Sequence, residues 1–178
     1  MKTLITILSI ALLVPIANIR GETLEPKSEV KGEVLEFGII ESVGAEKAVA
    51  SPESAFGKAV SAPGARFIER TNQIPANLGT TFAFKFKITG VTEKDTADYK
   101  LVVIHPPFKN AKGEIERQYS AVKSWPTQDF TLTTITGYRL NHSDELIPGI
   151  WTFEIWYHSQ KVVLQSFNVV RQGVNPTP

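Results

Sequence analysis

Hydrophobic side chains recur at every second position over long stretches of this sequence. The clearest run is Phe82, Phe84, Phe86 and Ile88, which alternate with small or polar residues. Successive side chains of a β-strand point to opposite faces, so this run puts its aromatic groups on one face and two lysines on the other. The same period returns over residues 151–157. Such segments predict β-sheets.

We expect about eight short strands, separated by turns rich in glycine and proline, in one domain. They cover residues 34–43, 65–71, 82–88, 99–104, 116–123, 130–136, 151–157 and 161–170. One short helical turn is expected at residues 141–146, capped by Asn141 or Ser143. The fold class is therefore all-β, an antiparallel two-sheet immunoglobulin-like β-sandwich with at most one short helical turn. A closed barrel is the alternative.

The register of the last hairpin follows from its large apolar side chains. A three-residue loop at residues 158–160 pairs Trp151 with Phe167 and Ile155 with Val163. A two-residue turn would instead put Phe167 and Trp151 on opposite faces, which is costly where one face is buried. We favour the longer loop.

The two ends of the chain differ in composition from its centre. Residues 1–17 have the single lysine and the apolar run of a secretory signal peptide, and are too short to span a membrane. Residues 18–31 are polar and predict a flexible tether, and residues 172–178 predict a disordered tail. The β-sandwich domain occupies residues 32–171. We therefore expect export to the periplasm or outer envelope of a Gram-negative bacterium, with no transmembrane segment after signal removal.

Composition excludes several classes of function. The chain has 178 residues, with 19 basic and 18 acidic side chains and no cysteine. A charge this close to zero supplies no field for nucleic acid, so no nucleic-acid partner is expected. The absence of cysteine removes disulfide scaffolds, thiol nucleophiles and cysteine-based zinc sites.

Catalytic motifs are missing as well. The sequence has no nucleophile elbow, phosphate-binding loop, dinucleotide fingerprint or zinc-protease motif. Its three histidines, His105, His142 and His158, do not stand at metal-ligand spacing. We expect no catalytic residue, no metal and no cofactor, and hence not an enzyme. A hydrolase using a pair such as His105 with a carboxylate is kept as an alternative.

Two groups of residues are candidates for binding. His105, Pro106 and Pro107 end a predicted strand, because neither proline donates to a ladder. They form either a rigid ledge that presents His105 to a partner or a simple strand terminator.

The second group is aromatic. It consists of Trp156, Tyr157 and His158 at the last hairpin, together with Trp125 elsewhere in the chain. Exposed rings of this kind stack on sugars or anchor protein interfaces, but they also cover the open ends of sandwiches.

Several segments, in their order, resemble a family of exported bacterial proteins known only as a domain of unknown function. They are residues 36–41, 74–80 with the phenylalanine-rich strand after it, 105–107, 148–157 and 165–167. The resemblance covers residues 34–170 and implies a single exported sandwich-like domain with no established activity. It carries over no catalytic residue.

We therefore expect a non-catalytic binding or interaction module of the periplasm or envelope, with an unknown protein or glycan partner. A protein partner would use an unpaired sheet edge or the aromatic face. The alternative is a carbohydrate-binding module that uses Trp125, Trp156 and Tyr157 as stacking platforms.

Overall fold

The computed structural model describes residues 29–171. The expected signal peptide, most of the tether and the C-terminal tail lie outside these residues. The strands are β1 (Lys31–Val43), β2 (Lys47–Ala50), β3 (Lys58–Ser61), β4 (Gly64–Glu69), β5 (Gln73–Pro75), β6 (Thr81–Thr89), β7 (Thr96–Lys109), β8 (Ile115–Gln128), β9 (Thr131–Arg139), β10 (Gly149–Tyr157) and β11 (Gln160–Val170). The helical turn η1 spans Ser143–Glu145.

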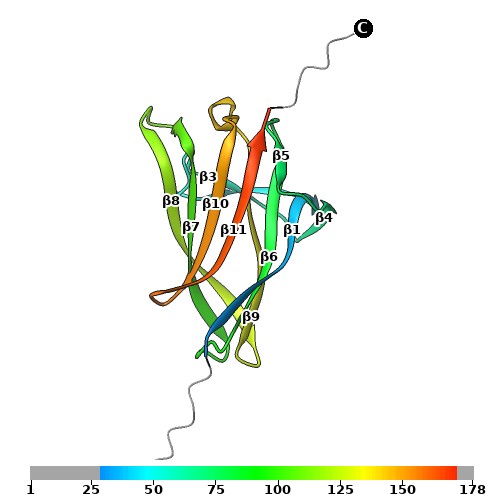
Figure 1. Ribbon diagram of the computed structural model, residues 1–178, viewed down its shortest axis with the longest axis vertical. Coiled ribbons are helices and arrows are strands. Elements are labelled where there is room, and N and C mark those ends of the chain that lie inside the picture. The colour runs from blue at the N-terminus through cyan, green and yellow to red at the C-terminus, as the bar shows by residue number, and fades with distance from the viewer. Residues whose placement is uncertain (1–28, 172–178) are drawn as a thin grey trace, which may run out of the picture.

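Nine of these strands form one curled sheet in the order β4-β1-β6-β9-β8-β7-β10-β11-β5, and β2 and β3 form a separate ribbon (Figure 1). Neighbours pair antiparallel, except that the short β5 runs parallel to β11. The sheet folds over on itself, so that β4, β1, β6 and β9 make one half and β8, β7, β10, β11 and β5 make the other. The all-β class and the single short helical turn are confirmed. The expected two separate sheets are instead joined into one.

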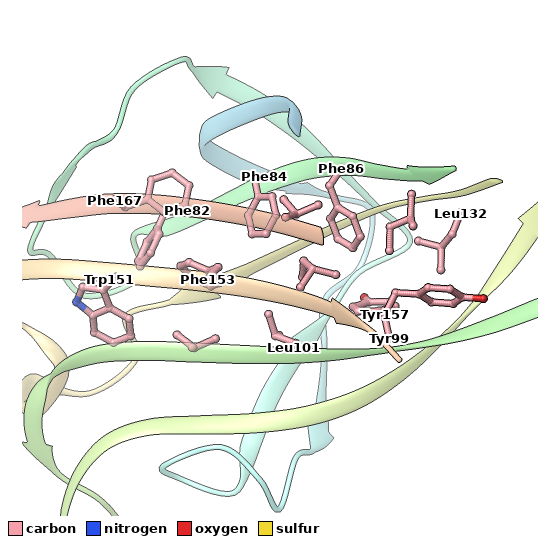
Figure 2. Packing of buried hydrophobic residues seen from close by; sticks show 14 of the residues in the cluster. Phe82, Phe84, Phe86, Tyr99, Leu101, Leu132, Trp151, Phe153, Tyr157 and Phe167 are labelled. Carbon is pink, nitrogen blue, oxygen red and sulfur yellow. The ribbon is translucent and has the colours of Figure 1, made fainter. Parts of the chain in front are cut away.

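The core lies between the two halves. Phe82 of β6 has its ring 5.8 Å from that of Trp151, 5.9 Å from Phe153 and 5.1 Å from Phe167, all close to edge-on. Figure 2 shows the side chains of β6 pointing toward those of β10 and β11. These residues are buried. We call the face that carries them the inner face and the opposite face the outer face.

One side of the curl is closed by direct backbone contact. A Cβ atom on Gly32, at the start of β1, would lie 2.2 Å from the carbonyl oxygen of Val162 in β11. Only glycine permits this approach, because any larger side chain would push the two strands apart. The two halves therefore touch at this side, and the opposite side is bounded by β8 and β9.

The register of the last hairpin is confirmed, since Trp151 pairs with Phe167 and Ile155 with Val163. The loop itself is shorter than expected. Tyr157 pairs with Gln160, which leaves a two-residue turn, and a bulge next to Ile155 takes up the extra residue. The bulge preserves the face of every large apolar side chain, which is what the register argument required.

Strand β7 continues through its two prolines instead of ending at them. Ile104 pairs with Gln118 of β8 and Phe108 pairs with Glu116, so the residues between form a bulge. Prolines are tolerated there because a bulge leaves the N–H positions outside the ladder.

Within residues 29–171, no helix has the length and apolar character that crossing a membrane requires.

Candidate functional site

Strands β8 and β9 leave one another soon after their hairpin. Only two pairs join them, Thr127 with Leu132 and Gln128 with Thr131 (Figure 1). The next pair would need an N–H from Pro126, which proline lacks. The ladder stops there, and a cleft opens between the inner face of β8 and the edge of β9.

A long excursion of the chain covers this cleft. Residues 44–63, which we call the strap, leave β1, form the β2–β3 ribbon and return to β4. Within the described residues the ribbon pairs only with itself. Its tip is held by the ring of Phe56, whose centroid lies 3.7 Å from that of His142, and by a bond from the Ala111 N–H to the Ala55 oxygen.

The strap and the cleft bound a cavity of about 810 Å³ that is partly open to solvent. Strand β8 contributes Tyr119, Lys123 and Trp125, and β9 contributes every residue from Thr134 to Arg139. Side chains of both faces of β9 take part, so the free edge of this strand projects into the space. The volume lies in the range of pockets that hold small molecules or peptide segments.

Charged groups at the rim tie the strap to the sheet. Lys123 Nζ lies 3.1 Å from Glu53 Oε1, and Arg139 Nη1 lies 2.8 Å from each oxygen of Glu46. The pKa of the Glu53 carboxyl is lowered, chiefly by a bond from its own backbone N–H and then by Lys123. Such partly exposed pairs contribute little stability, so they hold the strap loosely.

One buried carboxylate lies at the end of the cavity. Glu145 accepts bonds from the Tyr138 hydroxyl at 2.5 Å and from the N–H groups of Asn141 and His142 at 2.6 and 2.8 Å. Burial, followed by the charge of Glu145, raises the pKa of Tyr138. Both oxygens are thus engaged, and the carboxylate orders the η1 turn.

Of the residues singled out from the sequence, Trp125 lies in the cleft. Its side chain is on the inner face of β8, opposite Ala97 of β7, yet 45% of the residue is exposed. The core does not extend this far along β8. Trp125 is therefore a half-exposed wall of the cavity.

His105 is elsewhere, inside the protein. Its ring stacks 4.4 Å from Phe108 and 4.9 Å from Trp151, and its side chain is fully buried. Burial lowers its pKa, against the opposing effects of the Pro106 carbonyl and Glu116. Nε2 faces Glu116 Oε1 at 3.8 Å, and neither atom has a hydrogen-bond partner. The imidazole has no face open to a substrate.

The neighbouring prolines differ from His105 in exposure. Pro106 is half-buried against Gly149, where an added Cβ would lie 2.7 Å from its ring, and Pro107 is exposed. This segment does not line the cavity, so the structure keeps it apart from Trp125.

The aromatic residues of the last hairpin lie on different faces. Trp156 is on the outer face, where its Nε1 donates to Glu154 at 2.9 Å and Lys161 covers its ring at 5.6 Å. Tyr157 is buried, and its hydroxyl donates to Glu93 at 2.6 Å and accepts from the Thr92 N–H at 2.8 Å. His158 is exposed, 3.8 Å from Glu93. Trp156 and His158 line one hollow of about 360 Å³, whereas the buried Tyr157 does not line it. None of the three lies in the cleft.

Sequence reasoning missed the strap and the cleft. Each strap strand has four residues, a lysine, a valine and two small residues, and nearly all of them are exposed, so neither strand carries a stripe of large apolar side chains. The available signal was Pro126, a proline inside a run that otherwise extends as a strand.

Among the described residues, no group of three or more histidine, aspartate or glutamate side chains is placed to hold a metal ion. The site offers apolar walls, hydroxyl groups, lysines and the backbone of β9, which are suited to non-covalent binding.

Comparison with known proteins identifies a matching family and a structure with a similar fold. The family model that matches residues 28–169 is described as Domain of unknown function (DUF3859). An immunoglobulin-like protein from Pseudomonas aeruginosa has a similar crystal structure, with a TM-score of 0.57 and 21% identity over 82% of this chain and 100% of that one. A DNA-bound alkylpurine DNA glycosylase from Pseudomonas fluorescens reaches a TM-score of only 0.35, with 10% identity over 56% of this chain and 29% of that chain. No curated protein matches the sequence.

Proposed function

The chain belongs to the family described as Domain of unknown function (DUF3859), which assigns it no activity, and we propose a function from the structure. The protein is a non-catalytic binding module whose ligand occupies the cleft under the strap. The cavity of about 810 Å³ carries this proposal. It is large, it is bounded by elements far apart in the sequence, and its cover is attached mainly at its ends and tip. These are the properties of a site that admits a ligand and then closes around it.

Export is part of the same proposal. It rests on the composition of residues 1–17 and on the absence of cysteine, which suits a bacterial periplasm. Cell fractionation of the full-length protein tests it. We expect the protein in the periplasm or envelope fraction, with its mass reduced by about 17 residues. Full-length protein in the cytosol would contradict export but would not contradict ligand binding in the cleft.

Two tryptophans make a matched pair for testing the site. Trp125 lies in the cleft on the inner face of β8, whereas Trp156 lies on the outer face of β10 in the same half of the sheet, and both are partly exposed. A photo-crosslinking amino acid is placed at each position in turn in the full-length protein, which is expressed in its own host and irradiated in intact cells. Mass spectrometry of the recovered protein then detects adducts of any size.

We expect adducts from position 125 and none from position 156. Adducts from position 156 alone would overturn the cleft as the binding site and would favour a platform on the outer face. No adduct at either position would contradict a bound ligand in the envelope.

A carbohydrate ligand is the second candidate, and the half-exposed ring of Trp125 favours it. A panel of soluble envelope glycans distinguishes this case. Thermal stabilisation by a glycan that is lost in Trp125→Ala and kept in Trp156→Ala would establish sugar binding in the cleft.

A further inference from the structure

The edge of β9 that faces the cleft is unpaired beyond the hairpin. The β8–β9 ladder holds two residue pairs, and no backbone bond from the strap to β9 occurs among the described residues. From Thr133 onward the strand therefore pairs on one side only, with β6. A row of unpaired backbone groups of this kind is a template for another strand.

The β6–β9 ladder determines which groups are free. The Leu140 N–H donates to the Thr80 oxygen, and the Leu140 oxygen accepts from the Gly79 N–H, so the polar groups of Leu140 point to the β6 side. In an antiparallel ladder such pairs alternate with pairs whose N–H and C=O point away. Counting back along the register, Thr136 and Thr134 face β6, whereas Gly137, Ile135 and Thr133 direct their polar groups to the free edge.

The free groups of Ile135 and Gly137 open into the cavity, whereas Thr133 lies outside its lining. Residues 134–139 all line it, with the odd-numbered side chains on the outer face and the even-numbered ones on the inner face. Six residues of strand extend about 20 Å. The space beside the edge is thus long enough for an extended segment rather than a compact ligand alone.

The charges around the space indicate the character of that segment. Four cationic side chains line the cavity, Lys58, Lys85, Lys123 and Arg139, against the two carboxylates of Glu53 and Glu145. Two of the cations are already paired, Lys123 with Glu53 and Arg139 with Glu46, which leaves Lys58 and Lys85. Both carboxylates are already engaged, Glu53 by Lys123 and Glu145 by Tyr138 and two N–H groups. Lys85 forms no ion pair within the described part of the chain. An acidic side chain is complementary to this lining.

We infer that the cleft binds an extended polypeptide segment of another protein, bearing an acidic residue, which adds to the free edge of β9 as a strand beneath the strap. This inference rests on the proposed function and specifies its ligand class. The main chain of the segment bonds to Ile135 and Gly137. Its alternate side chains contact the walls formed by Tyr119 and Trp125.

A displayed library of random heptapeptides, selected on the full-length protein, supplies the probe. The best peptide is synthesised with a single N-methyl group at each position in turn. We expect the selected peptides to be enriched in an acidic residue. In the series of singly methylated peptides, we expect binding to be at least tenfold weaker at every second position and unchanged at the positions between. The alternation arises because only every second residue of an added strand bonds to the edge.

Amide hydrogen exchange locates the added strand independently of any variant. The N–H groups of Thr134 and Thr136 should be protected in the free protein, since they pair with β6. Those of Ile135 and Gly137 should exchange fast without peptide and slowly with it. Protection at β4 or β5 instead would overturn the inference.

A proline variant removes one donor from the free edge. Ile135→Pro should keep the fold, because the Ile135 N–H faces away from β6, and should abolish peptide binding, while Ile135→Val binds as the parent does. If Ile135→Pro does not fold, the N-methyl and exchange results decide alone. If no peptide is enriched, the inference is wrong; adducts of a small molecule at position 125 would then still support the proposed function.

Discussion

Gly137 of β9 lies where the backbones of β6 and β9 approach closely, and its substitution tests that approach. A Cβ on Gly137 would lie 2.3 Å from the Phe82 oxygen and 2.6 Å from the Ala83 Cβ, both fixed parts of β6. Gly137→Ala should therefore lower the free energy of unfolding by about 1–3 kcal/mol. Gly64→Ala is the control, since its nearest neighbour would be Val43 Cβ at 3.5 Å, an ordinary contact. Urea denaturation measures both, and equal stability of the two variants would contradict the close approach.

The Tyr157 hydroxyl should make stability depend on pH through Glu93. Its hydrogen bond is the main reason that the pKa of Glu93 is lowered. A carboxyl with a lowered folded-state pKa stabilises the fold above its unfolded pKa, and this contribution disappears as the pH falls through the folded value. Tyr157→Phe should cost about 1 kcal/mol at pH 7. The cost should shrink below pH 4.5, the ordinary glutamate value.

Urea midpoints at pH 7 and pH 3.5 check this result. Tyr99→Phe serves as the control, because burial alone raises the pKa of Tyr99 to about 12 and no carboxylate is involved. A difference between Tyr157→Phe and the parent that stays constant with pH would show that Glu93 does not depend on this bond.

At the level of elements, the β8–β9 hairpin contains an avoidable strain. Its two turn residues, Asp129 and Phe130, have φ values of 50° and 54°. Positive φ at both positions is the geometry of a tight hairpin turn, which favours asparagine and glycine. Phe130→Gly should raise the free energy of unfolding by about 1 kcal/mol, because Phe130 is 47% exposed and glycine adopts this φ freely. Thermal denaturation that shows a lower midpoint would contradict this.

The strap should open separately from the rest of the fold. Its ribbon shares no ladder with the nine-stranded sheet, and Phe56 supplies the main contact at its tip. Phe56→Ala should accelerate proteolytic cleavage within residues 51–57 severalfold while changing the midpoint of global unfolding little. Phe130→Ala, at the opposite hairpin, is the control. Unchanged cleavage would show that Phe56 does not fasten the strap.

The long strands could be predicted from the sequence because each carries a complete stripe of large apolar residues. Phe82, Phe84 and Phe86 can face only a core, and pairing Trp151 with Phe167 follows from burial alone. The strap could not be predicted, because Ala48 or Ala59 has too little apolar surface to define a face. The strand β5 was missed for a related reason, since three residues contain no period.

The candidate site was harder to predict than the fold. Trp125 was identified as a candidate because it is a tryptophan. Its place in a cleft depends on Pro126, which ends the ladder between β8 and β9. The sequence alone does not show that these two strands pair. Tyr157 and His158 are neighbours in sequence, yet one is buried and the other exposed. Adjacent residues of a strand face opposite ways, so proximity in sequence is poor evidence for a shared surface.

For the molecule as a whole, the shared core predicts cooperative unfolding. Phe82 belongs to one half of the sheet and contacts three aromatic residues of the other. Neither half keeps its apolar face buried without its counterpart. Transitions followed by tryptophan fluorescence and by far-ultraviolet circular dichroism should therefore coincide. Phe82→Ala should shift both equally, by about 3–5 kcal/mol. Two separate transitions would mean that the halves fold independently.

The separation of the strap from the main sheet has an evolutionary consequence. The stability of the fold depends on the aromatic core, whereas the strap is joined to the sheet largely at its ends and tip. Substitutions and insertions within residues 44–63 therefore alter the shape of the enclosed space at little risk to the scaffold. Relatives with this fold can therefore differ in the ligand that the cleft accepts while keeping the same core. For the same reason, the proposed binding specificity can be engineered by changing the sequence of the strap alone.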